Sequence, residues 1–175
     1  KAAEKRLKEV GVNFIGGLAV DHCTSRHLCL QGHKFLPADI IVWTAGSRAN
    51  PFFERYPELF DLDPKKRVIV NEYMQAKSPN IYVLGDAAST QYSGMAQTAI
   101  YDGIQLAANF ARFVEGKELV PYKSQGPISV VPIGKEWAVV IQDGKLLTGA
   151  DGWKVRRAAD LWVLGNFLPD KLAKE

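Results

Sequence analysis

The sequence predicts an α/β protein that ends in an antiparallel β-ribbon and a helix. A nearly all-apolar run at 80–84 predicts a strand buried on both faces, as in parallel sheets. Apolar residues at helical spacing follow at 95–115 and predict a long helix. Beyond residue 121, short apolar segments on either side of Asp143-Gly144, a strong hairpin turn, predict antiparallel strands.

The first part of the chain predicts a helix, a hairpin and further strands. Residues 1–10 place Ala3, Leu7 and Val10 three and four apart, which is the spacing of one helix face. A polar stretch between two apolar segments then predicts a hairpin. The expected strands are 12–15, the paired 18–20 and 27–30 with a turn at 31–34, and a buried 38–43 that leads into Thr44-Ala-Gly46.

The middle of the chain begins with an irregular stretch, 47–66, in which Pro51, Pro57 and Pro64 indicate a linker or crossover. Strands are expected at 67–70 and 80–84. The helix at 95–115 is expected to have Ser93 or Gly94 as its cap and Gly116 just past its end. Its apolar face is predicted at Ile100, Ile104, Ala107, Ala111 and Val114, and small residues at 99, 103, 107 and 111 would admit a strand or a planar ligand.

The last part of the chain predicts strands at 128–131, 137–141 and 145–148, and a helix at 153–164. Two interpretations of this helix are open. In one, its Trp and Leu residues contact lipid headgroups beside Lys154, Arg156 and Arg157. In the other, the same apolar residues pack on protein or in a dimer, which the weak polar face of the helix favours.

Composition excludes several classes of protein. The 175 residues carry a net charge of +3 and are 47% hydrophobic and 23% charged, so disordered and collagen-like proteins are excluded. The mild charge, with acids and bases interspersed, predicts no nucleic-acid partner. No apolar run is long enough to span a membrane. The lack of a signal segment predicts a cytoplasmic protein, and the first residue, which is not Met, together with the uncapped first helix predicts a piece of a longer chain.

Two cysteines, Cys23 and Cys29, do not form a disulfide framework in a chain of this length, so both are expected to be structural thiols. The nearby His22, His27 and His33 match no zinc-binding spacing. We therefore expect no metal site.

The clearest chemical signal is Gly85-Asp86, which follows the expected strand at 80–84 and precedes the long helix. A carboxylate at the carboxyl end of such a strand can accept hydrogen bonds from the hydroxyls of a sugar alcohol. The free N–H groups at the start of the next helix suit an anion or a carbonyl that gains negative charge. A reduced flavin, which carries negative charge at one edge, would suit this arrangement, and a common Gly-Asp turn that only caps a helix is the alternative.

Longer motifs favour the flavin over the plain turn. Residues 78–88 with 94–99 and Gly103 resemble the second flavin-binding motif of the two-dinucleotide-binding-domain flavoproteins, and 38–51 and 67–71 resemble neighbouring blocks of that family in the same order. Residues 121–126 and 131–139 resemble the C-terminal domain of type II NADH:quinone oxidoreductases. The resemblance implies a partial Rossmann-like FAD/NAD(P)-binding fold. Its expected parts are the end of an NAD(H)-binding domain at 1–47, half of an FAD-binding domain at 48–120, and a β-ribbon with a dimer-forming or membrane-surface helix at 121–175.

The same resemblance implies a function and its residues. The family transfers hydride from NADH to FAD and electrons to a quinone. Carried onto this chain, Asp86 holds the ribityl chain of FAD, Gly85 is a further cofactor-binding residue, and the backbone of Ala96 and Gln97 faces the pyrimidine edge of the flavin. Lys135, with Gln97, is the expected catalytic group that stabilises negative charge or delivers protons. The remaining expected cofactor residues are Thr44 and Gly46, and the expected quinone pocket is Gln97, Tyr101 and Lys135.

Two alternatives remain open: another flavoprotein of this fold, such as an NADH oxidase or sulfide:quinone oxidoreductase, or a module that serves only self-association. The chain contains no Gly-x-Gly-x-x-Gly loop, so we expect it not to bind FAD or NADH tightly by itself. Expected partners are the N-terminal part of the same polypeptide, a quinone and a second copy of the chain. The resemblance also implies peripheral contact with the inner face of the membrane.

Overall fold

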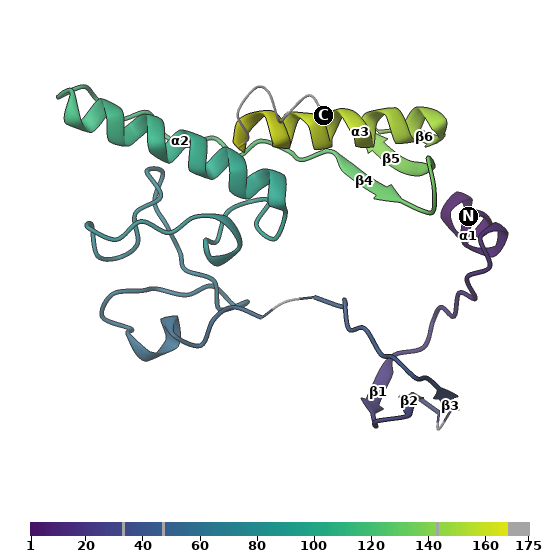
Figure 1. The fold of residues 1–175 in the computed structure, drawn as a ribbon. Coiled ribbons are helices and arrows are strands. Elements are labelled where there is room, and N and C mark those ends of the chain that lie inside the picture. Colours follow the sequence, from purple (N-terminus) through teal and green to yellow (C-terminus); the bar gives the residue numbers. More distant parts are fainter. Residues whose placement is uncertain (33, 47, 143, 168–175) are drawn as a thin grey trace. The chain divides into compact units, whose positions relative to one another are not determined.

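The computed structural model describes residues 1–32, 34–46, 48–142 and 144–167, and the chain divides into two compact units (Figure 1). Unit 1 combines Lys1–Thr44 with the chain from Ile128 onward, and unit 2 is Ala45–Pro127. The predicted α/β class, with an antiparallel β-ribbon and a helix near the C-terminus, is confirmed. The domain boundaries predicted from the sequence stay predictions.

The β-ribbon of unit 1 is a three-stranded antiparallel sheet of β4 (Ser129–Pro132), β5 (Ala138–Gln142) and β6 (Lys145–Gly149). Val140 in the central strand pairs with Val130 on one side and Leu147 on the other, and is fully buried. The helix α3 (Ala150–Phe167) packs on this sheet and begins three residues before the predicted start. Asp143 of the predicted turn lies outside the described residues.

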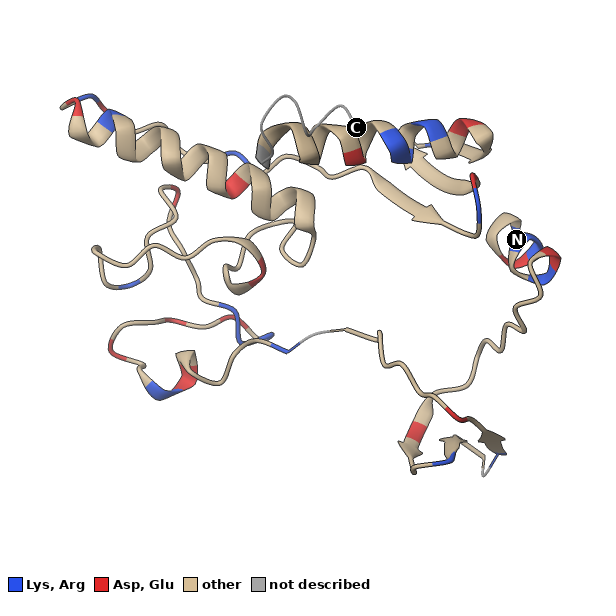
Figure 2. Ribbon diagram, viewed as in Figure 1, with Lys and Arg blue, Asp and Glu red and all other residues tan. Residues whose placement is uncertain are grey.

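The first helix of the chain, α1 (Ala2–Glu9), agrees with the prediction, and no side chain caps its start. It carries both acidic and basic residues (Figure 2). The Arg6 side chain joins α1 to the ribbon: its Nε lies 3.3 Å from the Ile133 carbonyl oxygen, and its guanidinium lies 5.7 Å from the centre of the Trp137 ring. Because α1 buries no residue of its own, this cation–π contact and the Arg6 hydrogen bond attach the helix to the ribbon.

A second antiparallel sheet contains β1 (Val20–Cys23), β2 (His27–Leu30) and β3 (Lys34–Pro37). The predicted hairpin is confirmed, and β3 is a strand that the sequence did not predict. Strands expected at 12–15 and 38–43 are wrong: Ile40 and Val42 are 82% and 77% exposed. A strand needs a neighbour for its backbone hydrogen bonds, and neither segment pairs with one in the described part of the chain.

Unit 2 has a small core of Phe60, Val68, Ala76, Val83 and Ala88 inside irregular chain. The strands expected at 67–70 and 80–84 are wrong as regular elements. Val68 makes isolated bridges to Leu62 and Ala88, and Tyr82 makes one to Gln75.

The long helix α2 (Ala96–Val114) is confirmed, but its cap and its buried face differ from the prediction. Met95 is the N-cap residue, and the Ser93 hydroxyl instead bonds the Ala88 and Thr90 carbonyls. The buried residues of the helix are Thr98, Asp102, Leu106 and Asn109, whereas Ile104 and Val114 of the predicted apolar face are 50% and 84% exposed. Asn109 explains part of this orientation, because its amide bonds both the N–H and the carbonyl of Val120 at 2.9 Å.

None of the helices within the described residues is both long and apolar enough to cross a membrane.

Candidate functional site

The Gly85-Asp86 motif forms a single turn of 3-10 helix, η2 (Gly85–Ala87), directly before the loop that leads to α2. Gly85 is buried and has a φ of +65°. A Cβ atom at this position would lie 3.2 Å from the Ala99 Cβ of α2, so both the backbone conformation and the close approach favour glycine. The turn is thereby held against the small-residue face that the sequence predicted.

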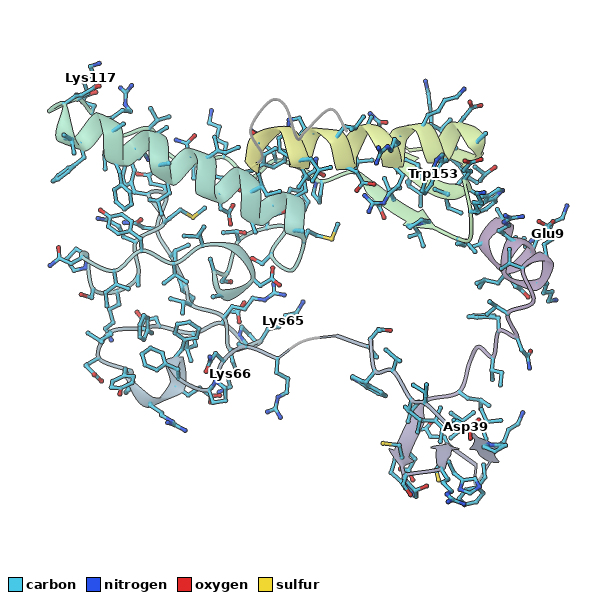
Figure 3. The ribbon with its side chains drawn as sticks, in the orientation of Figure 1. Glu9, Asp39, Lys65, Lys66, Lys117 and Trp153 are labelled. Carbon is cyan, nitrogen blue, oxygen red and sulfur yellow. The ribbon has the colours of Figure 1, made fainter. Side chains whose placement is uncertain are left out.

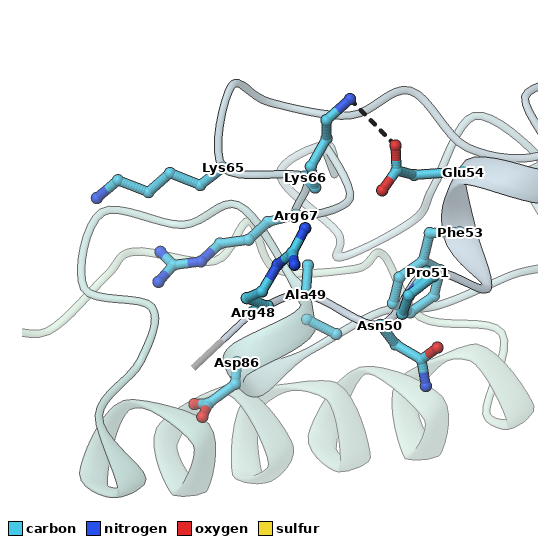
Figure 4. A pocket seen from close by; sticks show the side chains of 11 residues that line it. Arg48, Ala49, Asn50, Pro51, Phe53, Glu54, Lys65, Lys66, Arg67 and Asp86 are labelled. Atoms are coloured by element: carbon cyan, nitrogen blue, oxygen red, sulfur yellow. Dashed lines mark ion pairs between the residues drawn. The ribbon is translucent and has the colours of Figure 1, made fainter. Parts of the chain in front are cut away.

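Asp86 leaves this turn toward a cavity of about 630 Å³, which unit 2 forms by itself (Figure 4). The Asp86 side chain is exposed. Its carboxylate makes no hydrogen bond or ion pair with the other described residues. The cavity is lined by Arg48, Ala49, Asn50, Pro51, Phe53, Glu54, Lys65, Lys66, Arg67, Asp86 and Ala87.

The wall opposite Asp86 is basic. Lys65 and Lys66 leave the same loop (Figure 3), and Lys66 Nζ pairs with Glu54 Oε2 at 3.2 Å. Arg48, Lys65 and Arg67 have no ion-pair partner within the described ranges. Three cations and one carboxylate therefore remain to bind a ligand. A carboxylate accepts hydrogen bonds from hydroxyl groups, and guanidinium and ammonium groups bind phosphate oxygens, so the cavity suits a ligand that carries both.

Asp63 fixes the loop that carries this basic wall. Its Oδ1 accepts hydrogen bonds from the Lys65 N–H at 2.8 Å and the Arg67 N–H at 2.9 Å, and its Oδ2 accepts one from the Ser89 hydroxyl at 2.8 Å. Burial acts to raise the pKa of Asp63, but these hydrogen bonds and the Arg67 charge outweigh it and lower that pKa below 3.8. Asp63 thus connects Lys65 and Arg67 to the segment that follows Asp86.

The start of α2 holds two more predicted residues. Gln97 Nε2 lies 2.9 Å from the Tyr101 hydroxyl one helical turn later, so these two side chains form a pair. Ala96 and Gln97 lie in the first turn, where backbone N–H groups lack helical partners and no side chain of the N-cap residue bonds them. Neither residue lines the Asp86 cavity.

Of the other predicted site residues, Gly46 belongs to unit 2 and has a φ of +105°. Thr44 and Lys135 belong to unit 1, and both are exposed. Lys135 lies in the turn between β4 and β5, after Gly134. The structure thus describes Asp86, Gln97 and Tyr101 within one unit and Lys135 in the other.

Sequence reasoning missed the basic wall of the cavity. Its signal is the run Lys65-Lys66-Arg67 with Arg48 upstream, which the sequence shows but which only the fold brings to one cavity. It also missed Asp102, a carboxylate in the middle of α2 that is fully buried. Within the part of the chain that the structure describes, no cluster of three or more potential metal ligands is found.

Residues 1–108 match the family described as pyridine nucleotide-disulphide oxidoreductase. The chain is 32% identical over 127 residues to an NADH oxidase of Enterococcus faecalis, covering 69% of this chain and 27% of that protein. It is 32% identical over 79 residues to a probable mitochondrial NADH-ubiquinone oxidoreductase of Schizosaccharomyces pombe, covering 44% of this chain and 14% of that protein. The chain spans about a quarter or less of the length of the curated relatives it matches.

Among solved structures, a NAD-dependent persulfide reductase from A. fulgidus is similar, with a TM-score of 0.66 and 18% sequence identity. The match covers 79% of this chain and 27% of that one. At this identity the likeness concerns the fold, which is the Rossmann-like arrangement that the sequence predicted.

Proposed function

The chain belongs to the pyridine nucleotide-disulphide oxidoreductase family, and we propose that it is part of an FAD-dependent NADH dehydrogenase that passes electrons to a quinone. The observation that carries the cofactor part is Asp86: its carboxylate is unpaired among the described side chains and lines a cavity with a basic wall. FAD combines ribityl hydroxyls with a diphosphate. The carboxylate and the cations of this cavity can bind these two kinds of group.

The residues present fit FAD. Asp86 accepts hydrogen bonds from ribityl hydroxyls, and Arg48, Lys65 and Arg67 offer charge to phosphate oxygens. The N–H groups at Ala96 and Gln97 donate to the edge of a flavin ring that gains negative charge. When bound, FAD supplies an acceptor for the hydride of NADH. Thr44 and Gly46 remain the proposed residues at the exit from the NADH-binding part.

The quinone part of the proposal rests on Gln97, Tyr101 and Lys135. The Gln97 amide and the Tyr101 hydroxyl form a polar pair one turn into α2, which can hold a quinone carbonyl oxygen. Lys135 is exposed and carries a charge that can stabilise a reduced quinone or supply a proton. The relative named as an NADH-ubiquinone oxidoreductase supports this acceptor.

The second candidate is an NADH oxidase, which passes electrons to oxygen. The Enterococcus faecalis relative is named as one and covers more of the chain than the quinone-linked relative does. Anaerobic NADH oxidation by the complete protein, with a short-chain ubiquinone or with oxygen readmitted, separates the two. Rapid turnover with the quinone supports our proposal, and turnover with oxygen alone contradicts it.

We also propose as partners the N-terminal part of the same polypeptide and a second copy of the chain, and as location the inner face of the membrane, which the resemblance to type II NADH:quinone oxidoreductases implies. The helix α3 offers Leu161 and Trp162, which are 42% and 39% exposed, to such a surface. Its first turn packs on the β-ribbon, where Gly152 is buried against β5. Sedimentation with anionic liposomes, with and without Trp162→Ala, tests the membrane contact.

The cofactor proposal is tested by titrating FAD into the purified chain and following backbone amide signals by NMR, which detects weak binding. We expect amides at 48–54, 65–67 and 85–87 to shift, and Asp86→Ala to weaken FAD binding at least fivefold. Asp61→Ala is the matched control, because Asp61 is an exposed carboxylate of the same unit that pairs with Lys77 at 3.3 Å, away from the cavity lining. Equal loss in both variants, or shifts elsewhere, would contradict the assignment.

A further inference from the structure

Asp102 is the one buried acidic or basic residue among the described residues of α2, and its carboxyl group reaches back to the turn that carries Asp86. Asp102 is fully buried, and its Oδ2 accepts a hydrogen bond from the Gly85 N–H at 2.9 Å. The two residues are seventeen apart in sequence. A hydrogen bond from a backbone N–H to a buried carboxylate oxygen is directional and shielded from water, so it fixes the backbone at Gly85.

Little else fixes the direction of the Asp86 side chain. Its carboxylate has no protein partner in the described ranges, so its position follows from the backbone of η2. That backbone is held by the Ala88 N–H to Gly85 carbonyl bond at 3.1 Å, by the Val68 N–H to Ala87 carbonyl bond at 2.8 Å, by the contact of Gly85 with Ala99, and by Asp102. Of these contacts, Asp102 provides the side-chain hydrogen bond to the N–H group of Gly85, the residue directly before Asp86.

The surroundings of Asp102 are polar and buried. Thr98 lies one helical turn earlier on the same face and is fully buried, and Tyr122 faces Asp102 from the segment after α2. Burial, as the larger cause, and the neighbouring Asp102 carboxylate raise the pKa of Tyr122 to about 12, whereas Ser124 acts to lower it. The Tyr122 phenol therefore remains neutral. Asp102 Oδ1, Thr98 Oγ1 and the Tyr122 hydroxyl are buried and make no hydrogen bond of normal length and angle with the described residues, although the Tyr122 hydroxyl is close enough to Asp102 for that carboxylate to shift its pKa. Such burial is costly, and a core that needed only packing would hold apolar residues here.

We propose that Asp102 is a positioning residue: from behind the turn, its carboxylate holds the Gly85 amide and thereby sets where the Asp86 carboxylate stands in the cavity. The Tyr122 phenol faces the Asp102 carboxylate, and Thr98 lies beside it on the same buried face of α2. What Asp86 then binds rests on the proposed function, whereas the positioning itself does not.

The test compares Asp102→Ala, Asp102→Asn and a control on the same helix, Asn109→Ala. Asn109 is also buried and polar, and it bonds Val120 rather than η2. In the chain without added ligand, we expect Asp102→Ala to speed hydrogen exchange of the Gly85 amide at least tenfold and to shift the amide signals of Asp86 and Ala87. Asp102→Asn retains an acceptor oxygen and should restore most of both signals. Asn109→Ala should change neither.

An FAD titration of the same variants gives the functional readout. We expect Asp102→Ala to raise the FAD dissociation constant at least fivefold, Asp102→Asn to lie within about twofold of the wild type, and Asn109→Ala to leave it unchanged. The positioning role would be overturned if hydrogen exchange of the Gly85 amide were unchanged in Asp102→Ala, or if Asn109→Ala lost as much FAD affinity as Asp102→Ala. If FAD binds to no variant, the wild type included, the cofactor proposal fails for this chain, and the Gly85 and Asp86 signals still decide the role of Asp102.

Discussion

Gly152, in the first turn of α3, lies against the carbonyl oxygen of Ala138 in β5: a Cβ atom at Gly152 would lie 2.3 Å from that oxygen. The helix therefore packs backbone to backbone on the central strand of the ribbon. Ala138 itself is fully buried. The contact explains why a residue with low helix propensity stands near the start of a helix.

We expect Gly152→Ala to lower the free energy of unfolding by about 1–3 kcal/mol, because the added methyl group forces α3 away from β5. Gly165→Ala on the same helix is the control, since nothing lies within 4 Å of a Cβ atom there. That substitution should raise stability by about 0.5–1 kcal/mol. Urea unfolding followed by circular dichroism measures both. A Gly152→Ala variant as stable as the wild type would contradict the close packing.

Arg67 should distinguish flavins that carry a diphosphate from those that do not. Arg67→Gln removes a cation from the cavity wall, so we expect FAD affinity to fall by about three- to tenfold. Riboflavin, which has no phosphate, should bind equally well to both proteins. Lys77→Gln is the control, because Lys77 already pairs with Asp61 and does not line the cavity. An equal loss for riboflavin would place the phosphate elsewhere.

Asp63 should make stability depend on pH in acid. Its pKa is lowered from 3.8 in the folded chain, so its ionised form stabilises the fold above that value, and this contribution is lost as the pH falls through the folded pKa. We expect the difference in unfolding free energy between the wild type and Asp63→Asn to be largest above a pH of about 5 and to shrink below about 4. Urea unfolding midpoints of both proteins, measured on both sides of this pH range, give that difference in unfolding free energy. Asp39→Asn, at an exposed aspartate in an irregular segment, provides the reference; a difference that grows in acid would contradict the hydrogen-bond assignment.

The two thiols should differ in reactivity. Cys23 is exposed, whereas Cys29 is 2% exposed and pairs across the hairpin with His22. We expect iodoacetamide to modify Cys23 at least tenfold faster than Cys29 in the folded chain, because a buried sulfur must wait for opening of the sheet. Peptide mass spectrometry after timed quenching gives both rates. In urea the two rates should converge, and equal rates without urea would contradict the burial of Cys29.

Local patterns predicted the regular elements whose partners lie close in sequence. The ribbon β4–β6 was predictable because each strand pairs with the next one along the chain through a short turn. The helix α2 was predictable in its extent from helical periodicity and from Gly116, which has a φ of +67°. The segment 38–43 shows the limit: its apolar sequence fits a buried strand, but the described chain provides no strand beside it, so Trp43 is 63% exposed.

The sequence by itself determined the Gly85-Asp86 turn and its place before a long helix. The tolerance of glycine for a positive φ and the ability of a carboxylate to accept hydrogen bonds are both local properties. Only the tertiary structure decided which residues share the cavity with Asp86. Arg48 and Arg67 reach it from segments that are nineteen positions apart, and Asp102 on α2 bonds Gly85, seventeen positions earlier in the chain. Side-chain charge can be read along a chain, but hydrogen bonds and cavities depend on distances in space, which chain folding sets.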